Sequence, residues 1–416
     1  MKDLLRANGA RLWDSLMEMA KLGATAAGGS RRLALSAEDG AGRDLFVRWC
    51  KDAGCSVAVD ELGNLFARRE GQDASRNPVA AGSHLDTQPH GGKFDGVFGV
   101  LAALEVVRTL NDHAIQTLAP VEIVMWTNEE GARFAPAMLG SGVFAGAFEV
   151  EYGLSRADSD GVTVGEALAE IGYAGSEPCG VHPLECLFEA HIEQGPILEN
   201  EDKTIGVVTG VQGIRWYDAS VSGQDTHAMT PLELRRDALL AAARMIDRVN
   251  AIAHDHMPNA ASTVGVIAAE PGSRNTVPGD VRFTVDLRHH EEARLDEMEV
   301  ALRQELQAIA AQADVVLAIE SIWSSAGVTF HPDCINAVRA SVEALGHSHR
   351  DIVSGAGHDA VYTSRVVPTS MIFVPCAGGL SHNEAESATP DDLAAGCNVL
   401  LNAVLERAGT TGESGD

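Results

Sequence analysis

The sequence predicts an α/β fold: a discontinuous main domain with a mixed sheet flanked by helices, and an inserted α+β domain. The chain has 416 residues, more than one hydrophobic core usually organises. Helix-like and strand-like patterns alternate over the first two hundred residues, which is typical of a sheet covered by helices. The pattern then changes and later resumes. We therefore expect the main domain at residues 1–209 and 327–416, and the inserted domain at residues 210–326.

The first part of the main domain is predicted as a helix, two short strands and a β-α-β run. Ser36 with Asp39 three residues later is typical of a capping box, and a helix should continue to about Cys50. Strands at 56–60 and 64–68 are joined by a turn. An apolar strand at 79–82, a helix at 97–110 and a buried strand at 121–126 follow.

The inserted domain and the return to the main domain are predicted from the same periodicities. Within the insert we expect a strand at 216–221, a helix at 235–252, strands at 263–268 and 280–287, a helix at 292–311 and a strand at 315–319. The main domain then resumes with a helix at 335–345, a strand at 371–374 and a helix at 391–406.

Composition excludes several classes of partner. Lys and Arg total 31 against 59 Asp and Glu, giving a net charge of −28 that repels nucleic acids and anionic lipid surfaces. No apolar run approaches the roughly eighteen residues that a membrane span needs. Seven cysteines without a C-x-x-C pair suit reduced thiols, and the N-terminus shows no export signal. We expect a soluble cytoplasmic protein that binds neither nucleic acid nor membrane.

Five short segments place histidines and carboxylates at predicted strand ends or in loops. They are residues 82–87, 92–96, 127–131, 190–195 and 380–384. Because the carboxyl ends of strands in an α/β sheet face one crevice, these side chains can converge there. Convergence would bring together the ligands of a metal site.

Each candidate also has an ordinary structural interpretation. His84 follows a strand and Asp86 could orient its imidazole, but a surface histidine beside a turn fits equally. Glu129 and Glu130 could divide labour between proton transfer and metal binding, or form a solvated acidic loop. Asp95 could bridge two cations or cap the following helix.

Taken together, the order H-x-D, D-G, E-E-G, H-x-E-Q-G and S-H-x-E is specific. With Gly355–Ala360 and Gly378–His382, these blocks make the chain resemble the zinc-dependent amidases of the hydantoinase/carbamoylase family, a branch of the aminoacylase-like metallopeptidase superfamily. The resemblance covers nearly the whole chain. It implies a di-metal catalytic domain, an inserted lid and dimerisation domain, and a homodimer.

The resemblance also implies roles for individual residues. Asp95 would bridge two divalent ions, with His84 and His191 completing one site and Glu130 and His382 the other, while Glu129 acts as general acid and base. Zinc is the expected metal, with manganese, cobalt and nickel as alternatives. Substrate contacts are implied for the following residues: Gln194, His227, Asn275, Arg288, Gly357, Gly378 and Gly379.

Two of the implied substrate contacts, Arg288 and His227, lie in the expected inserted domain. Arg288 ends a predicted strand and would hold a substrate carboxylate through its planar guanidinium, although a surface arginine is the plainer interpretation. His227 would contact the developing oxyanion. It precedes Ala228-Met229-Thr230-Pro231, one residue shorter than the loop of similar proteins, so the loop can sit differently.

The implied activity is hydrolysis of the ureido C–N bond of an N-carbamoyl-L-amino acid, giving the amino acid, ammonia and carbon dioxide. Allantoate amidohydrolase and beta-ureidopropionase activities are alternatives. More distant alternatives are an N-acyl amino acid hydrolase or dipeptidase, and a non-catalytic protein that binds metal or amino acid. In every enzymatic case the substrate is small and carries a carboxylate.

Overall fold

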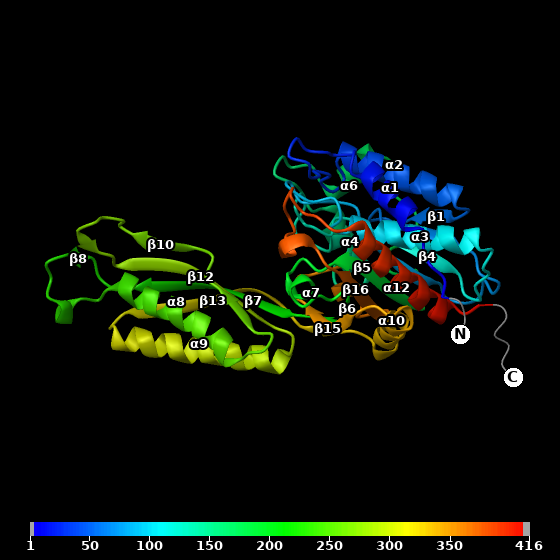
Figure 1. Cartoon of the computed structure of the whole chain (residues 1–416). Helices are drawn as coiled ribbons and strands as arrows, with labels where there is room; N and C mark the ends of the chain where they lie inside the picture. The colour runs from blue at the N-terminus through cyan, green and yellow to red at the C-terminus, as the bar shows by residue number, and fades with distance from the viewer. Residues whose placement is uncertain (1–3, 411–416) are drawn as a thin grey trace. The chain divides into compact units, whose positions relative to one another are not determined.

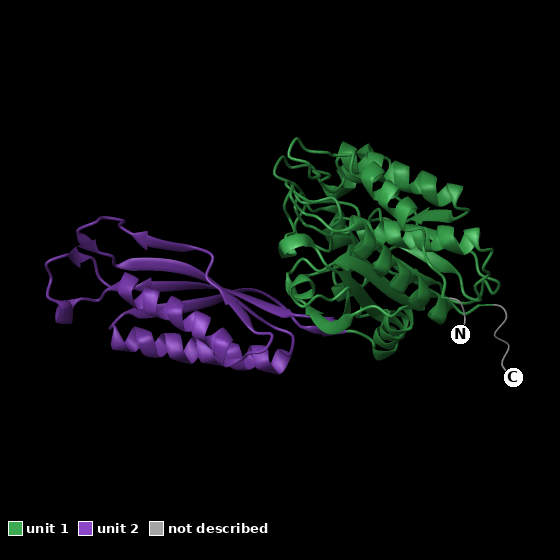
Figure 2. Ribbon diagram, viewed as in Figure 1, with its two compact units in different colours: residues 1–209, 330–416 green, residues 210–329 purple. Residues whose placement is uncertain are grey.

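The computed structural model describes residues 4–410, which fall into two compact units. Unit 1 comprises residues 1–209 and 330–416, and unit 2 comprises residues 210–329 (Figure 2). The chain therefore leaves unit 1 once and returns to it once. Among residues 4–410, no helix is both long enough and apolar enough to cross a bilayer.

Unit 1 is built on a large mixed sheet (Figure 1). Its strands are β1 (Ser56–Val59), β2 (Leu65–Arg69), β3 (Val79–His84), β4 (Val121–Trp126), β5 (Cys186–Ile192), β6 (Ile205–Val211), β15 (His349–Ser354) and β16 (Thr369–Val374). The order is β1-β2-β4-β3-β5-β16-β6, continued by β14 (Val328–Thr329), and β15 also pairs with β6. The four central strands, β4, β3, β5 and β16, run parallel.

Helices flank this sheet. They are α1 (Gly9–Met19), α2 (Ala37–Asp52), α3 (Val97–Asp112), α4 (Leu139–Phe144), α5 (Val150–Leu154), α6 (Val164–Glu170), α7 (Ile197–Asn200), α10 (Pro332–Leu345), α11 (Ala360–Thr363) and α12 (Pro390–Ala408), with the 3-10 turn η2 (Ala377–Gly379). Helices α3 and α12 pack against β3 and β5 and against each other. Both helices bury long apolar faces, as expected for helices that cover a parallel sheet.

Unit 2 is a separate α+β unit with its own core. Its main sheet has the order β10 (Ile267–Glu270), β12 (Asp280–His289), β7 (Gly213–Ser222) and β13 (Val316–Ser325), and β9 (Ala261–Thr263) also pairs with β12. Helices α8 (Ala238–Asp255) and α9 (Glu292–Gln312) pack on this sheet and bury apolar side chains against it. The remaining elements are the two-stranded pair β8 (Thr226–His227) and β11 (Thr276–Val277), and the 3-10 turn η1 (Leu232–Leu234).

Most predicted elements are confirmed, and two predictions are corrected. The single strand expected at 263–268 is wrong, because β9 ends at Thr263 and β10 begins at Ile267. Between them the Val266 N–H bonds the Thr284 hydroxyl instead of a backbone carbonyl, which interrupts the ladder. Helix α8 starts at Ala238 and not near Arg235, because Asp237 caps it by accepting the Leu240 N–H.

The predicted start of α2 at Ser36 is confirmed, but the Asp39 side chain has a different hydrogen-bond partner from the one a capping box implies. Ser36 caps the helix by accepting the Asp39 N–H, as predicted. The Asp39 carboxylate, however, accepts the N–H of Leu35 and not that of Ser36. In a standard capping box the side chain at the position of Asp39 would accept the N–H of the cap residue, Ser36. Here it accepts the N–H of the preceding residue, Leu35.

Candidate metal centre

The carboxyl ends of the four parallel strands carry the predicted metal ligands. His84 is the last residue of β3, and Glu129 and Glu130 follow β4. His191 lies near the end of β5, and His382 lies in the segment after β16. Since parallel strands end at the same edge of a sheet, the topology alone brings these side chains together.

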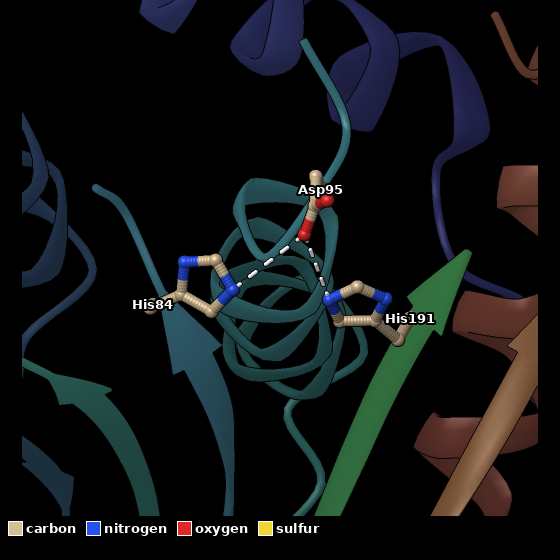
Figure 3. Close-up of side chains that lie close together, drawn as sticks. All are labelled: His84, Asp95 and His191. Carbon is tan, nitrogen blue, oxygen red and sulfur yellow. Dashed lines mark ion pairs between the residues drawn. The ribbon is translucent and has the colours of Figure 1, made fainter. Parts of the chain in front are cut away.

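Two buried imidazoles face one carboxylate. Figure 3 shows His84 and His191 on either side of Asp95, each with a ring nitrogen directed at the same carboxylate oxygen. The distance to Asp95 Oδ1 is 3.6 Å from His84 Nε2 and 3.2 Å from His191 Nε2. Two ligands that each lie about 2.1 Å from one ion are separated by roughly 3.0–3.5 Å, so this spacing suits a shared cation.

Backbone carbonyls fix both rings. His84 Nδ1 lies 2.9 Å from the carbonyl oxygen of Asp86, and His191 Nδ1 lies 2.9 Å from that of Ile192. A carbonyl can only accept, so each Nδ1 carries the proton and each Nε2 is directed to the cluster. Gly96 is required here: it has a φ of +66°, and a Cβ at that position would lie 2.3 Å from the His84 ring. Histidine ligands of metals are commonly held in this way.

A second group of ligands shares Asp95. His382 Nε2 lies 3.5 Å from Asp95 Oδ2 and 3.3 Å from Glu130 Oε2. The two oxygens of Asp95 therefore face different partners: Oδ1 faces His84 and His191, and Oδ2 faces His382. The alternative role of Asp95 as a helix cap is not observed, because the residue before α3 is Gly96 and no side chain caps that helix.

The charges of the centre favour cations. Burial, and then neighbouring carboxylates, raise the pKa values of Glu129 and Glu130 well above their usual range. Burial would likewise raise the pKa of Asp95, but the adjacent imidazoles outweigh it and lower that pKa. Burial would lower the pKa of His191, yet the bond to Asp95 raises it to about 9. Electrostatics that attract a proton to this point also attract a metal ion.

The donor set consequently fits two divalent ions. It combines imidazole nitrogens with carboxylate oxygens, which suit zinc and other first-row metals. One carboxylate placed between two ligand groups matches the arrangement of paired hydrolytic metals. A third buried group, Glu189, His191 and His358, shares His191 with the first.

Glu129 lies beside the centre without belonging to either ligand group. Its Oε2 is 3.4 Å from His84 Nε2, and its side chain is 10% exposed. The alternative interpretation, a solvated acidic loop, is therefore not observed for this residue. The placement leaves Glu129 next to both ligand groups and available for proton transfer.

Asp86 supports the centre through both its backbone and its side chain. Asp86 contacts the His84 ring as the sequence predicted, and it does so through its backbone carbonyl. The carboxylate instead accepts the backbone N–H groups of Glu129 and Glu130, at 3.3 and 3.2 Å. Asp86 thus holds the loop that carries both glutamates.

Sequence reasoning missed three polar residues in contact with the ligands. Gln88 donates its backbone N–H and its Nε2 to the Glu130 carboxylate, at 3.1 and 2.8 Å. Ser381 donates its hydroxyl to Asp95 Oδ2 at 2.7 Å, and Glu386 accepts the backbone N–H of Asp95 at 3.2 Å. Gln88 directly follows the segment 82–87 and Ser381 is the serine of S-H-x-E, and these positions were the available signal.

The predicted substrate residues of unit 1 lie in loops near these motifs. Gln194 has a φ of +56° and donates Nε2 to Asp95 Oδ2 at 2.8 Å. The Gly378 N–H is donated to Glu199, and the Gly379 N–H to the Cys376 carbonyl. Gly357 lies in the loop after β15. The substrate roles of these residues stay predictions.

The other predicted substrate residues lie in unit 2. His227 on β8 pairs with Thr276 on β11, so His227 and Asn275 are neighbours. His227 is exposed, and its Nδ1 accepts the Met229 N–H at 3.1 Å. Arg288 makes a salt bridge with Asp286, 2.9 Å from Nη2 to Oδ2, which the sequence analysis did not predict. Their participation with the residues of unit 1 stays a prediction.

Comparison with known proteins identifies the family. A model of the peptidase family M20/M25/M40 matches residues 80–406. The chain belongs to this family. Among family relatives it is 50% identical to an N-carbamoyl-L-amino-acid amidohydrolase from Rhizobium meliloti, over 97% of each protein. It is 32% identical to an allantoate amidohydrolase from Escherichia coli, over 93% of this chain and 95% of the relative.

A solved structure gives the same result for the fold of this M20 family member. A hydantoinase/carbamoylase family amidase from Burkholderia multivorans is 58% identical, with a TM-score of 0.95 over 97% of this chain and 98% of that one. The predicted family resemblance and the predicted α/β class, a large mixed sheet flanked by helices, are both confirmed.

Proposed function

We propose that the chain is a metal-dependent amidohydrolase that cleaves the ureido C–N bond of N-carbamoyl-L-amino acids. The observation that carries the proposal is the buried Asp95 carboxylate between two ligand groups, with Glu129 beside them and outside both. The similarity to an N-carbamoyl-L-amino-acid amidohydrolase supports the substrate class. A protein that only binds metal has no need of a buried carboxylate outside the ligand groups, so Glu129 disfavours a non-catalytic role.

The two ligand groups would hold one divalent ion each and share Asp95. When bound, such a pair supplies Lewis acidity and favours a nucleophilic oxygen at neutral pH. Zinc suits the mixed nitrogen and oxygen donors, and manganese, cobalt and nickel are alternatives. His84 and His191 belong to one site, and Glu130 and His382 to the other.

Glu129 would carry the proton through the reaction. Its Oε2 accepts a proton from the attacking water, and the oxygen adds to the ureido carbonyl carbon. Glu129 then returns the proton to the amino acid nitrogen as the C–N bond breaks. The products are the free amino acid and a carbamate, which decomposes to ammonia and carbon dioxide. His227 would donate a hydrogen bond to the oxygen that gains negative charge.

The substrate choice has one supported alternative. The similarity to an allantoate amidohydrolase favours allantoate as the second candidate. Beta-ureido acids and N-acyl amino acids complete the set of substrates that the same chemistry would cleave. Discrimination depends on the side chains that line the pocket.

One experiment tests the function directly. Zinc-loaded protein is incubated with carbamoyl amino acids, allantoate, a beta-ureido acid and acetyl amino acids, while ammonia and free amino acid are measured. We expect ammonia and amino acid from the carbamoyl substrates, loss of turnover after chelation, and recovery with zinc. Release of ammonia from allantoate alone would favour the second candidate. No turnover of any ureido compound would contradict the proposal.

Arg288 is expected to bind the substrate carboxylate. Its salt bridge with Asp286 orients the planar guanidinium, which can form two parallel hydrogen bonds to a carboxylate. A charged hydrogen bond contributes about 1.5–3 kcal/mol, so Arg288→Ala should raise KM by roughly 10- to 100-fold with a smaller change in kcat. Arg288→Lys should recover only part of the loss of substrate affinity, because an ammonium group cannot form two parallel hydrogen bonds to a carboxylate.

Arg282 provides the matched control. It lies on the same strand, β12, and is exposed. Arg282→Ala should leave KM unchanged. An unchanged KM in Arg288→Ala would remove this residue from the binding site.

We also infer a cytoplasmic homodimer. The seven cysteines are free thiols, six of them buried, which suits a reducing compartment. In unit 2, the segment after His227 exposes Met229, Leu232 and Leu234, and such apolar side chains suit an interface between subunits. The mass of the full chain in solution tests the dimer, and a monomer at micromolar concentration would contradict it.

A further inference from the structure

Glu386 is a buried carboxylate to which the proposed reaction gives no part. It is 5% exposed and lies between the segment that carries His382 and the start of α12. A carboxylate is costly to bury unless hydrogen bonds or charges compensate it. Its partners therefore indicate what it does.

The partners of Glu386 lie on the segment that supplies the shared ligand. Glu386 Oε1 accepts the backbone N–H groups of Phe94 and Asp95, at 2.9 and 3.2 Å. Its Oε2 lies 3.3 Å from the hydroxyl of Ser381. The Ser381 hydroxyl lies closer to Asp95 Oδ2, at 2.7 Å, so it donates its single proton there. Glu386 thus contacts both the backbone of Asp95 and the residue bound to its carboxylate.

The backbone of Glu386 is linked to His382 by a hydrogen-bonded turn. The N–H of Glu386 bonds the carbonyl of Asn383, and the Asn383 side chain accepts the N–H of Ala385. These bonds make a tight turn directly after His382, which itself has a left-handed φ of +53°. The turn and the carboxylate together join His382 to the backbone of Asp95.

The glycine-rich segment before Asp95 makes room for this carboxylate. A Cβ added at Gly92 would lie 2.0 Å from the carboxyl carbon of Glu386 and 2.1 Å from Oε1. Any side chain at position 92 would therefore displace the carboxylate. Gly92→Ala offers a way to disturb Glu386 without removing it.

We propose that Glu386 is a positioning residue that fixes Asp95 relative to His382, and so sets the geometry of the second metal site. The inference rests on the proposed metal centre. Residues that orient metal ligands typically contribute about 10- to 100-fold to metal affinity. Glu386 would contribute through Asp95 and His382 without contacting the metal.

The test measures zinc binding by calorimetry on the full chain, with no substrate present. Glu386→Ala should weaken the affinity of the site formed by Asp95, Glu130 and His382 for zinc by at least about tenfold. Glu386→Gln should stay near wild type, because an amide oxygen can accept the same two N–H groups. Gly92→Ala should reproduce the loss, and Gly92→Ala with Glu386→Ala should be no worse than Glu386→Ala alone, because both act on one contact.

A buried carboxylate elsewhere in unit 1 serves as the control. Glu105 is buried and pairs with Arg11, and its other hydrogen-bond partners are Asn8 and Thr109, neither of them a metal ligand. Glu105→Ala should lower the stability of the fold while leaving zinc affinity unchanged. An equal loss of zinc in Glu105→Ala would show that the effect of Glu386 is only structural, and would overturn the proposal.

The remaining outcomes are also decisive. Wild-type affinity for two zinc ions in Glu386→Ala would overturn this inference and leave the proposed function intact. Should Glu386→Ala fail to fold, wild-type affinity in Gly92→Ala would overturn it. Failure of the wild-type chain to bind zinc would instead contradict the proposed metal centre.

Discussion

Replacing Glu129 by Gln is expected to lower kcat by about 10²- to 10⁴-fold while the metal content stays unchanged. Glu129 lies 3.4 Å from His84 but belongs to neither ligand group. Glutamine occupies the same volume and removes only the ability to take up and return a proton. The measurement combines kcat on the best carbamoyl substrate with zinc per chain by atomic spectroscopy. KM should change little, because Glu129 does not hold the substrate carboxylate.

Glu122→Gln is the control for this substitution. Glu122 is also buried in unit 1, on β4, but it pairs with His182. Its replacement should leave kcat near the wild-type value. Full activity of the Glu129→Gln protein would show that Glu129 does not carry the proton. Loss of zinc from that protein would show that Glu129 is a metal ligand instead.

Replacing Asp95 by Ala should have the broadest effect, since it removes one ligand from each proposed site. The variant should bind less than one zinc ion per chain at concentrations that saturate the wild type, with turnover below detection. Zinc that binds only the folded chain raises Tm, so the zinc-dependent rise in Tm should also disappear. Zinc titration followed by thermal unfolding measures both effects.

His382→Ala is the matched comparison for Asp95→Ala. His382 belongs only to the group that also contains Asp95 and Glu130, so its loss should leave one zinc site intact. We therefore expect His382→Ala to bind one zinc ion per chain and Asp95→Ala to bind fewer than one. Retention of two zinc ions by Asp95→Ala would contradict the bridging role.

The ligand groups were predictable because their signal is local. His84, Glu129, Glu130 and His191 adjoin apolar strands that the sequence shows clearly, and the parallel order of those strands brings their ends together. The start of α8 and the break between β9 and β10 were not predictable from periodicity. One side-chain cap and one side-chain bond to a backbone N–H decide them.

The supporting contacts were harder to predict because they join distant segments. Glu386 binds a backbone N–H almost three hundred residues earlier in the chain, and a backbone donor leaves no trace in the sequence. Asp86 shows a different limit: its motif marks it as important, but not which of its atoms contacts which neighbour. Arg288 and Asp286 alternate on one strand and so share a face, and that local pair was available to sequence reasoning.

The split of unit 1 by unit 2 has a consequence for biosynthesis. Strand β5 ends at Ile192, but its neighbour β16 begins only at Thr369, after all of unit 2 has been made. Until then the nascent chain presents an open strand edge, and open edges pair readily with other chains. Ribosome stalling or truncation within that interval should therefore yield aggregates, and chaperones that shield exposed strands should be needed most while that interval is translated.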